Sequence, residues 1–143
     1  MTYKEGYKFE DLSVGMTHQT EHVITEDDIE LFAQVSGDRN PLHMDEEFAK
    51  QTAFGQRIAH GALTASYISG ILGNDLPGPG SIFVGLNMRF RRPVYIGSHV
   101  TVKVEVTEMK ERGHRVTLKV SCSVDGKAAI SGEAMVMVPS RDA

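Results

Sequence analysis

The sequence feature that most constrains the fold is a stretch without any charged residue, from Gly61 to Asn74. Within it, residues 62–72 are apolar on nearly every side of a helix, and the only polar side chains are the small ones of Thr64, Ser66 and Ser69. Because a helix that is apolar nearly all round has no face suited to water, we expect it to be buried. Gly73 is expected to end it.

The last sixty residues predict the partner of this helix. Apolar and polar side chains alternate along residues 82–90, 100–107 and 116–124, and residues 130–138 close the series. A period of two indicates strands with one buried face, and short turns such as Asp125-Gly126 favour antiparallel pairing. With a first strand at 17–24, we expect an α+β fold in which an antiparallel sheet of five to six strands wraps round the central helix.

The segment between the first strand and the buried helix is predicted to be helix and loop. Thr25 has the character of a helix N-cap, acidic residues follow it in the first turn, and Gly37 is a natural stop after about residue 35. The segment 36–43 is expected to be a loop because Pro41 cannot continue a helix. Residues 45–50 are expected to form one short helical turn.

Composition narrows the class of protein. The length of 143 residues suits one domain spanning 1–143, and the formal net charge of −4 argues against a nucleic-acid partner, which needs a basic face. No apolar run reaches the ~18 residues of a membrane span, and the N-terminus lacks the apolar centre of a secretory signal. The lone cysteine, Cys122, is expected to be a buried thiol. A cytoplasmic setting is therefore expected.

The segment Ser36–His43 carries the chemistry. It places a carboxylate, Asp38, and an imidazole, His43, five residues apart on a loop stiffened by Pro41, and Asn40 can hydrogen-bond the loop backbone or a ligand. Rigid loops with such a pair are typical of acid/base sites. Spacing alone favours structural roles instead, with Asp38 capping a turn and His43 partly buried. A metal site at His43 and Asp45 would lack a third ligand nearby.

Two further features could bind a substrate. Gly61 follows His60 at the start of the buried helix, where its N–H would have no helical partner and would suit a developing oxyanion, although a simple loop-to-helix turn explains it as well. A cluster of arginines could contact phosphate or merely lie on the surface: Arg89, Arg91 and Arg92.

Together these residues resemble the MaoC-like, (R)-specific enoyl-CoA hydratase family, also called hydratase 2. The family motif runs from an aromatic residue through S/T-G-D-x-N-P-aliphatic-H to a small residue six positions later. Here Phe32, the segment Ser36–His43 and Ala49 match every constrained position. The similarity covers about residues 10–138 and is greatest to the short, single-domain hydratases of polyhydroxyalkanoate synthesis.

The resemblance implies a hot-dog fold, a homodimer or higher homo-oligomer with sites at the dimer interface, and the hydration of trans-2-enoyl-CoA to (R)-3-hydroxyacyl-CoA by syn addition. Asp38 and His43 would be the catalytic acid/base pair, with Asp38 the base and His43 the proton donor. Gly61 N–H would hold the thioester carbonyl, and Asn40, Ser69 and Leu72 would complete the substrate site. No metal and no redox cofactor is implied.

Three alternatives remain open at this point. A thioesterase on the same fold would cleave the thioester, and a non-catalytic domain would only bind an acyl thioester. A dehydratase would run the same chemistry in reverse or act on branched or dicarboxylic acyl-CoA. The sequence does not distinguish acyl-chain lengths, nor CoA from acyl carrier protein.

Overall fold

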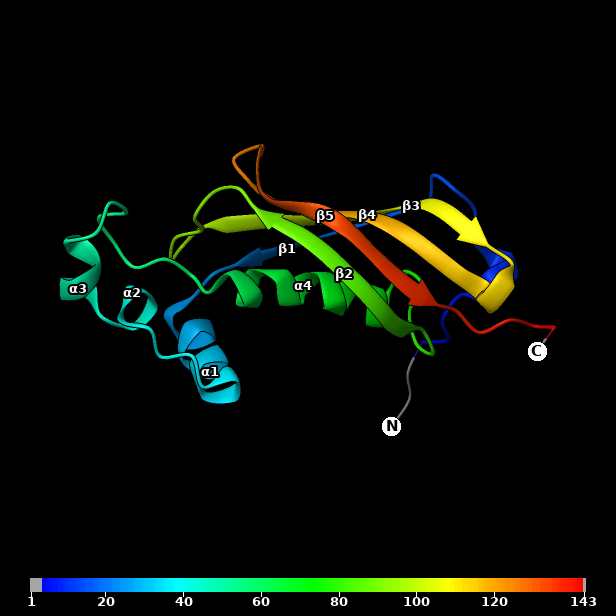
Figure 1. Cartoon of the computed structure of the whole chain (residues 1–143), viewed down its shortest axis with the longest axis horizontal. Coiled ribbons are helices and arrows are strands. Elements are labelled where there is room, and N and C mark those ends of the chain that lie inside the picture. The colour runs from blue at the N-terminus through cyan, green and yellow to red at the C-terminus, as the bar shows by residue number, and fades with distance from the viewer. Residues whose placement is uncertain (1–3, 143) are drawn as a thin grey trace.

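The computed structural model describes residues 4–142, whose strands form one antiparallel sheet (Figure 1). Its order is β1-β3-β4-β5-β2, so β1 and β2 are the edges. The strands are β1 (Thr17–Val23), β2 (Ile82–Phe90), β3 (His99–Lys110), β4 (Arg115–Val124) and β5 (Lys127–Met137). Short 3-10 turns occur at Phe9–Asp11 and Arg112–His114. The five-stranded α+β architecture predicted from the apolar pattern is confirmed.

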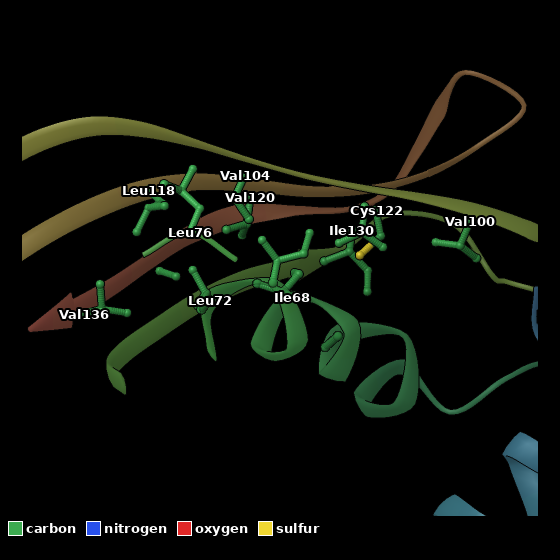
Figure 2. Close-up of a cluster of buried hydrophobic side chains, with 14 of the residues drawn as sticks. Ile68, Leu72, Leu76, Val100, Val104, Leu118, Val120, Cys122, Ile130 and Val136 are labelled. Atoms are coloured by element: carbon green, nitrogen blue, oxygen red, sulfur yellow. The ribbon is translucent and has the colours of Figure 1, made fainter. Parts of the chain in front are cut away.

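Helix α4 (Gly61–Asn74) lies along one face of the sheet (Figure 1). Ile68 and Leu72 project from it toward valines of the central strands, among them Val104 and Val120 (Figure 2). All four side chains are almost completely buried, and they belong to one continuous apolar core. Burial of this helix by the curved sheet is the hot-dog arrangement that the resemblance implied.

The expectation that α4 is buried on every side is wrong for the single chain. Its face away from the sheet is exposed and consists of small residues, which are Ala62, Ser66, Ser69, Gly70 and Gly73. The sheet covers only one side of the helix, and no other described element covers the opposite side. The helix also continues through Gly73 to Asn74. No helix within residues 4–142 combines the length and the apolar character that crossing a membrane would require.

Strand β2 differs from its prediction as well. One buried face was expected, but Ile82, Val84, Leu86 and Phe90 are each 41–61 % exposed. The strand pairs with β5 alone and lies at the sheet edge, whereas α4 packs chiefly on β3 and β4. Alternation in the sequence indicated a strand, but it did not indicate that this strand lies beyond the cover of the helix.

Three helices lie together beyond one end of the sheet, on the left of Figure 1. In α1 (Glu26–Ser36), Thr25 and Asp28 form the reciprocal hydrogen bonds of a capping box, and Gly37 ends the helix with φ of 78°. The expected loop at 36–43 overlaps α2 (Pro41–Met44), because proline is favoured in the first turn of a helix. The short turn expected at 45–50 is α3 (Glu46–Lys50).

Cys122 is the buried thiol that the sequence predicted. It is fully buried on β4, and desolvation raises its pKa to about 12. A thiol that remains protonated at neutral pH is a poor nucleophile, so Cys122 belongs to the core rather than to a catalytic site.

The edge strand β2 depends on a glycine opposite it. A Cβ on Gly132 would lie 2.0 Å from the carbonyl oxygen of Asn87 in β2. We expect Gly132→Ala to lower the free energy of unfolding by about 3 kcal/mol, because the backbones must separate to make room. Urea denaturation measures this loss. Gly85→Ala is the matched control, since its Cβ meets no atom within 4 Å, and an equal loss in both variants would contradict the explanation.

Candidate active site

Three side chains converge between α2 and the start of α4. One side-chain oxygen or nitrogen atom from each of Asp38, His43 and His60 lies within 4.8 Å of the other two. Asp38 is exposed, whereas His43 and His60 are buried. The Asp38 and His43 side chains that the sequence singled out are therefore close enough to hold one water molecule between them.

Local hydrogen bonds hold the segment from Ser36 to Leu42 in shape. Asp38 N donates to Ser36 Oγ at 3.1 Å, and Asn40 N donates to Asp38 Oδ1 at 3.0 Å. Asn40 Oδ1 in turn accepts from Leu42 N at 3.0 Å and so caps α2. Asn40 thus makes the hydrogen bond to the loop backbone that the sequence suggested.

The segment 57–60, just before α4, braces this motif from the other side. Arg57 Nε donates to the carbonyl oxygen of His43 at 2.6 Å, and Ile58 N donates to that of Leu42 at 3.3 Å. Nδ1 of His43 lies 2.8 Å from the carbonyl oxygen of Ile58, and Nε2 of His60 lies 3.0 Å from that of Asp38. Because carbonyl oxygens only accept, each of these ring nitrogens carries a proton and donates.

The hydrogen bond to Ile58 fixes which ring nitrogen of His43 can face a ligand. With Nδ1 protonated, a neutral ring offers a lone pair at Nε2 and an imidazolium offers an N–H there. The same nitrogen can therefore accept or donate a proton, while the ring orientation stays constant. Such an arrangement suits acid/base chemistry.

A pocket of about 380 Å³ adjoins His43, whereas Asp38 and Asn40 are not among the residues that line it. Its lining includes His43 and Gly61, and it is mainly apolar, with Phe54, Thr64, Phe90, Val94 and Ile130 among its walls. Gly61 begins α4, so its N–H has no partner within the helix. A Cβ at Gly61 would lie 2.7 Å from the Phe90 ring, so glycine permits this close approach of backbone and pocket wall.

Arg91 and Arg92 also line the pocket, and Arg89 does not. Arg91 Nε donates to Ser131 Oγ at 2.6 Å, and Arg92 donates to the carbonyl oxygen of Ala128 at 2.7 Å. Both arginines are exposed, and each is held at the pocket by a hydrogen bond to β5.

Two residues expected at the acyl chain do not line this pocket. Leu72 is 2 % exposed and belongs to the core, whereas Ser69 lies on the exposed face of α4. At 1.5 Å per residue, Ser69 lies about 12 Å and Leu72 about 16 Å along the helix from Gly61. His60, by contrast, reaches the centre of the site. Its place next to Gly61 was the only sequence signal for it, because the residue with which it bonds lies 22 positions away.

Comparison with known proteins identifies the family of the chain. The family model described as "MaoC like domain" matches residues 11–128. The chain is 47 % identical to an (R)-specific enoyl-CoA hydratase of Rhodospirillum rubrum, covering 93 % of this chain and 92 % of that protein. It is likewise 47 % identical to a 3-hydroxybutyryl-CoA dehydratase of Methylorubrum extorquens, over 94 % and 85 % of the two chains.

A solved structure of similar shape is the (R)-hydratase of Aeromonas caviae involved in polyhydroxyalkanoate biosynthesis. Its TM-score is 0.88 at 41 % identity, with 91 % of this chain and 99 % of that chain covered. The chain therefore belongs to the MaoC-like family. Within that family it is a hydro-lyase, an enzyme that adds water to a double bond or removes it.

The hydrogen bond from Arg57 to the carbonyl oxygen of His43 yields a prediction about stability. Arg57 has an 11 % exposed side chain, donates to the carbonyl of His43 and pairs with Glu26. We expect Arg57→Ala to cost about 1–3 kcal/mol, because a carbonyl at the motif loses its charged donor. Urea denaturation of Glu26→Gln is the control, since losing an exposed partner should cost less than ~1 kcal/mol. Equal losses in the free energy of unfolding would show that the ion pair with Glu26, and not the bond to His43, provides the stabilisation.

Proposed function

We propose that this chain catalyses the (R)-specific hydration of trans-2-enoyl-CoA to (R)-3-hydroxyacyl-CoA by syn addition of water. The observation that carries the proposal is the meeting of Asp38 with His43, which lines a pocket together with Gly61, whose N–H has no partner within α4. Activity on enoyl-CoA in the R. rubrum relative supports the same substrate class here.

The pair can perform the addition without a metal or a redox cofactor. Asp38, ionised, accepts a proton from a water molecule while the water oxygen bonds to C3 of the enoyl group. His43, protonated at Nε2, donates that proton to C2, and the proton gained by Asp38 then restores the imidazolium. Because both groups act from one side, oxygen and hydrogen add to the same face. The two groups are coupled, so their roles can be shared.

Gly61 N–H is proposed to bind the carbonyl oxygen of the thioester. Withdrawal of electrons toward that oxygen makes C3 electrophilic, and negative charge develops on the oxygen in the transition state. A helix N–H without a helical partner, with the positive end of the helix dipole behind it, stabilises such charge.

The remaining binding residues are proposed from where the substrate would extend once its carbonyl oxygen lies at Gly61. Asn40 shapes the motif next to the reacting atoms. Ser69 would meet an acyl chain that leaves the pocket along the exposed face of α4, whereas Leu72 is buried in the core and would act through the packing of that helix. Arg91 and Arg92 would meet the phosphates of CoA at the pocket mouth, since guanidinium groups suit phosphate geometry.

Dehydration is the same reaction in reverse, and the M. extorquens relative is named for that direction. A thioesterase is the second candidate. It would need a water directed at the thioester carbonyl carbon, whereas a carbonyl oxygen held by Gly61 is proposed to leave C3 facing the pair.

We also infer that the whole chain acts as one domain and forms a homodimer in the cytoplasm. Strand β2 supports a dimer, because its apolar side chains are exposed and its outer edge has no partner strand among residues 4–142. Pairing of β2 with its copy would cover both.

The catalytic pair is tested by two separate variants. Asp38→Asn removes the base and His43→Gln removes the proton donor, so each should lower kcat at least 10²-fold. Loss of the enoyl-thioester absorbance measures turnover on crotonyl-CoA, and chiral analysis should find the (R)-3-hydroxy product. Near-wild-type turnover in either variant, or an (S) product, would contradict the proposal. Release of free thiol from an acyl-CoA would instead identify a thioesterase.

The carbonyl contact is tested at Gly61 with a matched pair. Gly61→Ala and Gly61→Pro add the same Cβ near Phe90, but only proline removes the N–H. Proline is favoured at the first helical position, and ψ of 132° at His60 suits a following proline. We expect kcat of the proline variant to be on the order of 10²–10³-fold below that of the alanine variant. Equal kcat values would exclude the N–H from catalysis.

The dimer is tested at the exposed face of β2. Leu86 is 44 % exposed, and Leu86→Lys would place a charge in the proposed contact. We expect sedimentation velocity to find a dimer for the unaltered chain and a monomer for this variant. A monomeric unaltered chain would refute the proposal. Thr101→Lys, on β3 away from this edge, is the control that should leave the dimer intact.

A further inference from the structure

The geometry points to His60 as a positioning residue that sets the backbone of Asp38 and orients the ring of His43. This inference rests on the function proposed above, because it assigns His60 an effect on that reaction through the two catalytic side chains. His60 itself does not line the substrate pocket.

The first observation is the hydrogen bond from His60 to the catalytic motif. Nε2 of His60 donates to the carbonyl oxygen of Asp38 at 3.0 Å, across 22 residues of sequence. This bond joins the start of α4 to the peptide that follows the proposed base. The backbone of Asp38, and with it the point from which its carboxylate extends, is therefore fixed relative to the helix that begins at Gly61.

The second observation is that His60 caps α4 without using its side chain. It is the N-cap residue, a position where serine, threonine, aspartate and asparagine are favoured because their side chains bond the first N–H groups. The His60 side chain makes no such bond and turns toward Asp38 instead. Stabilisation of the helix start is thus forgone, and the N–H of Gly61 is left open to a ligand.

The third observation is a buried ring nitrogen of His60 without a hydrogen-bond partner in residues 4–142, an unfavourable feature that an apolar ring would not have. Nδ1 of His60 is buried and has no hydrogen-bond partner among the described residues. Leaving a buried polar atom unpaired is unfavourable, so space filling alone would be served better by phenylalanine. What the imidazole supplies and phenylalanine lacks is the Nε2–H that reaches Asp38.

The fourth observation is the stacking of rings around His60. Its centroid lies 4.2 Å from that of His43 at an interplanar angle of 32°, and 4.9 Å from that of Phe32. Phe32 thus supports His60, which in turn supports His43. One side chain therefore contacts both members of the catalytic pair, and a shift of ~1 Å in such a pair can cost 10²-fold in rate.

Two substitutions separate the hydrogen bond from the packing. His60→Phe keeps a ring against His43 and Phe32 but has no donor, and His60→Gln keeps a donor N–H. We expect His60→Phe to lower kcat on crotonyl-CoA on the order of 10²-fold with KM changed by less than about twofold. His60→Gln should recover part of this loss, and thermal unfolding should show both variants folded.

A matched control lies at the other end of α4. His18 is 3.5 Å from Asp75, which follows the last residue of the helix, so His18→Gln repeats the substitution away from the site. It should leave kcat unchanged. A purely structural role for His60 would lower the melting temperature or raise KM without lowering kcat of the folded protein, and that result would overturn the inference.

Histidine ¹⁵N NMR gives a readout independent of activity. The hydrogen bond requires a proton on Nε2 of His60. A proton on Nδ1 alone would overturn the inference even if the variants were slow.

Failure of this inference and failure of the proposed function are distinguishable. If Asp38→Asn abolishes turnover while His60→Phe retains kcat, only the positioning role is refuted. If Asp38→Asn retains turnover, the proposed function is refuted, and His60 has no catalytic pair to position.

Discussion

The packing of α4 against the inner face of the sheet is the contact on which the other features depend. Ile68 and Leu72 bind the helix to the central strands, and this fixes the direction in which its first residues point. Gly61 then stands at the helix start, next to Phe90 of the edge strand. A pocket forms where the backbone of the helix and the end of the sheet meet, so the core positions the site as well as stabilising the fold.

The proposed catalytic motif is held mainly by main-chain acceptors. Carbonyl groups of Asp38, Leu42, His43 and Ile58 receive bonds across the gap between α2 and the segment before α4. These bonds to carbonyl groups orient the side chains and leave most of their reactive atoms unused. Asp38 Oδ1 accepts from Asn40 N, so Oδ2 of Asp38 and Nε2 of His43 are the atoms that remain available to a water molecule. Preorganisation of this sort is what acid/base and electrostatic catalysis require.

Hydropathy patterns predicted where helices and strands occur better than they predicted which of their faces are buried. The uncharged stretch predicted α4, and alternation predicted the strands of the last sixty residues, because a period of two reflects the geometry of an extended backbone. Exposure of β2 and of the small-residue face of α4 was not predicted. Periodicity indicates which residues share a face, but not whether another layer covers that face. The helix at Pro41 was missed because proline stops a helix in its interior and favours one at its first turn.

The sequence by itself determined the fold class and the proposed catalytic motif, since apolar periodicity and the segment Ser36–His43 are local properties of the chain. Tertiary structure decided the tautomer of His43, the pocket and the place of His60. These depend on contacts between residues 15 to 22 positions apart, made across a turn whose path no local pattern specifies. Whether His60 only begins a helix or also touches the motif is a matter of how α4 docks on the sheet. Docking is decided by the burial of the whole core.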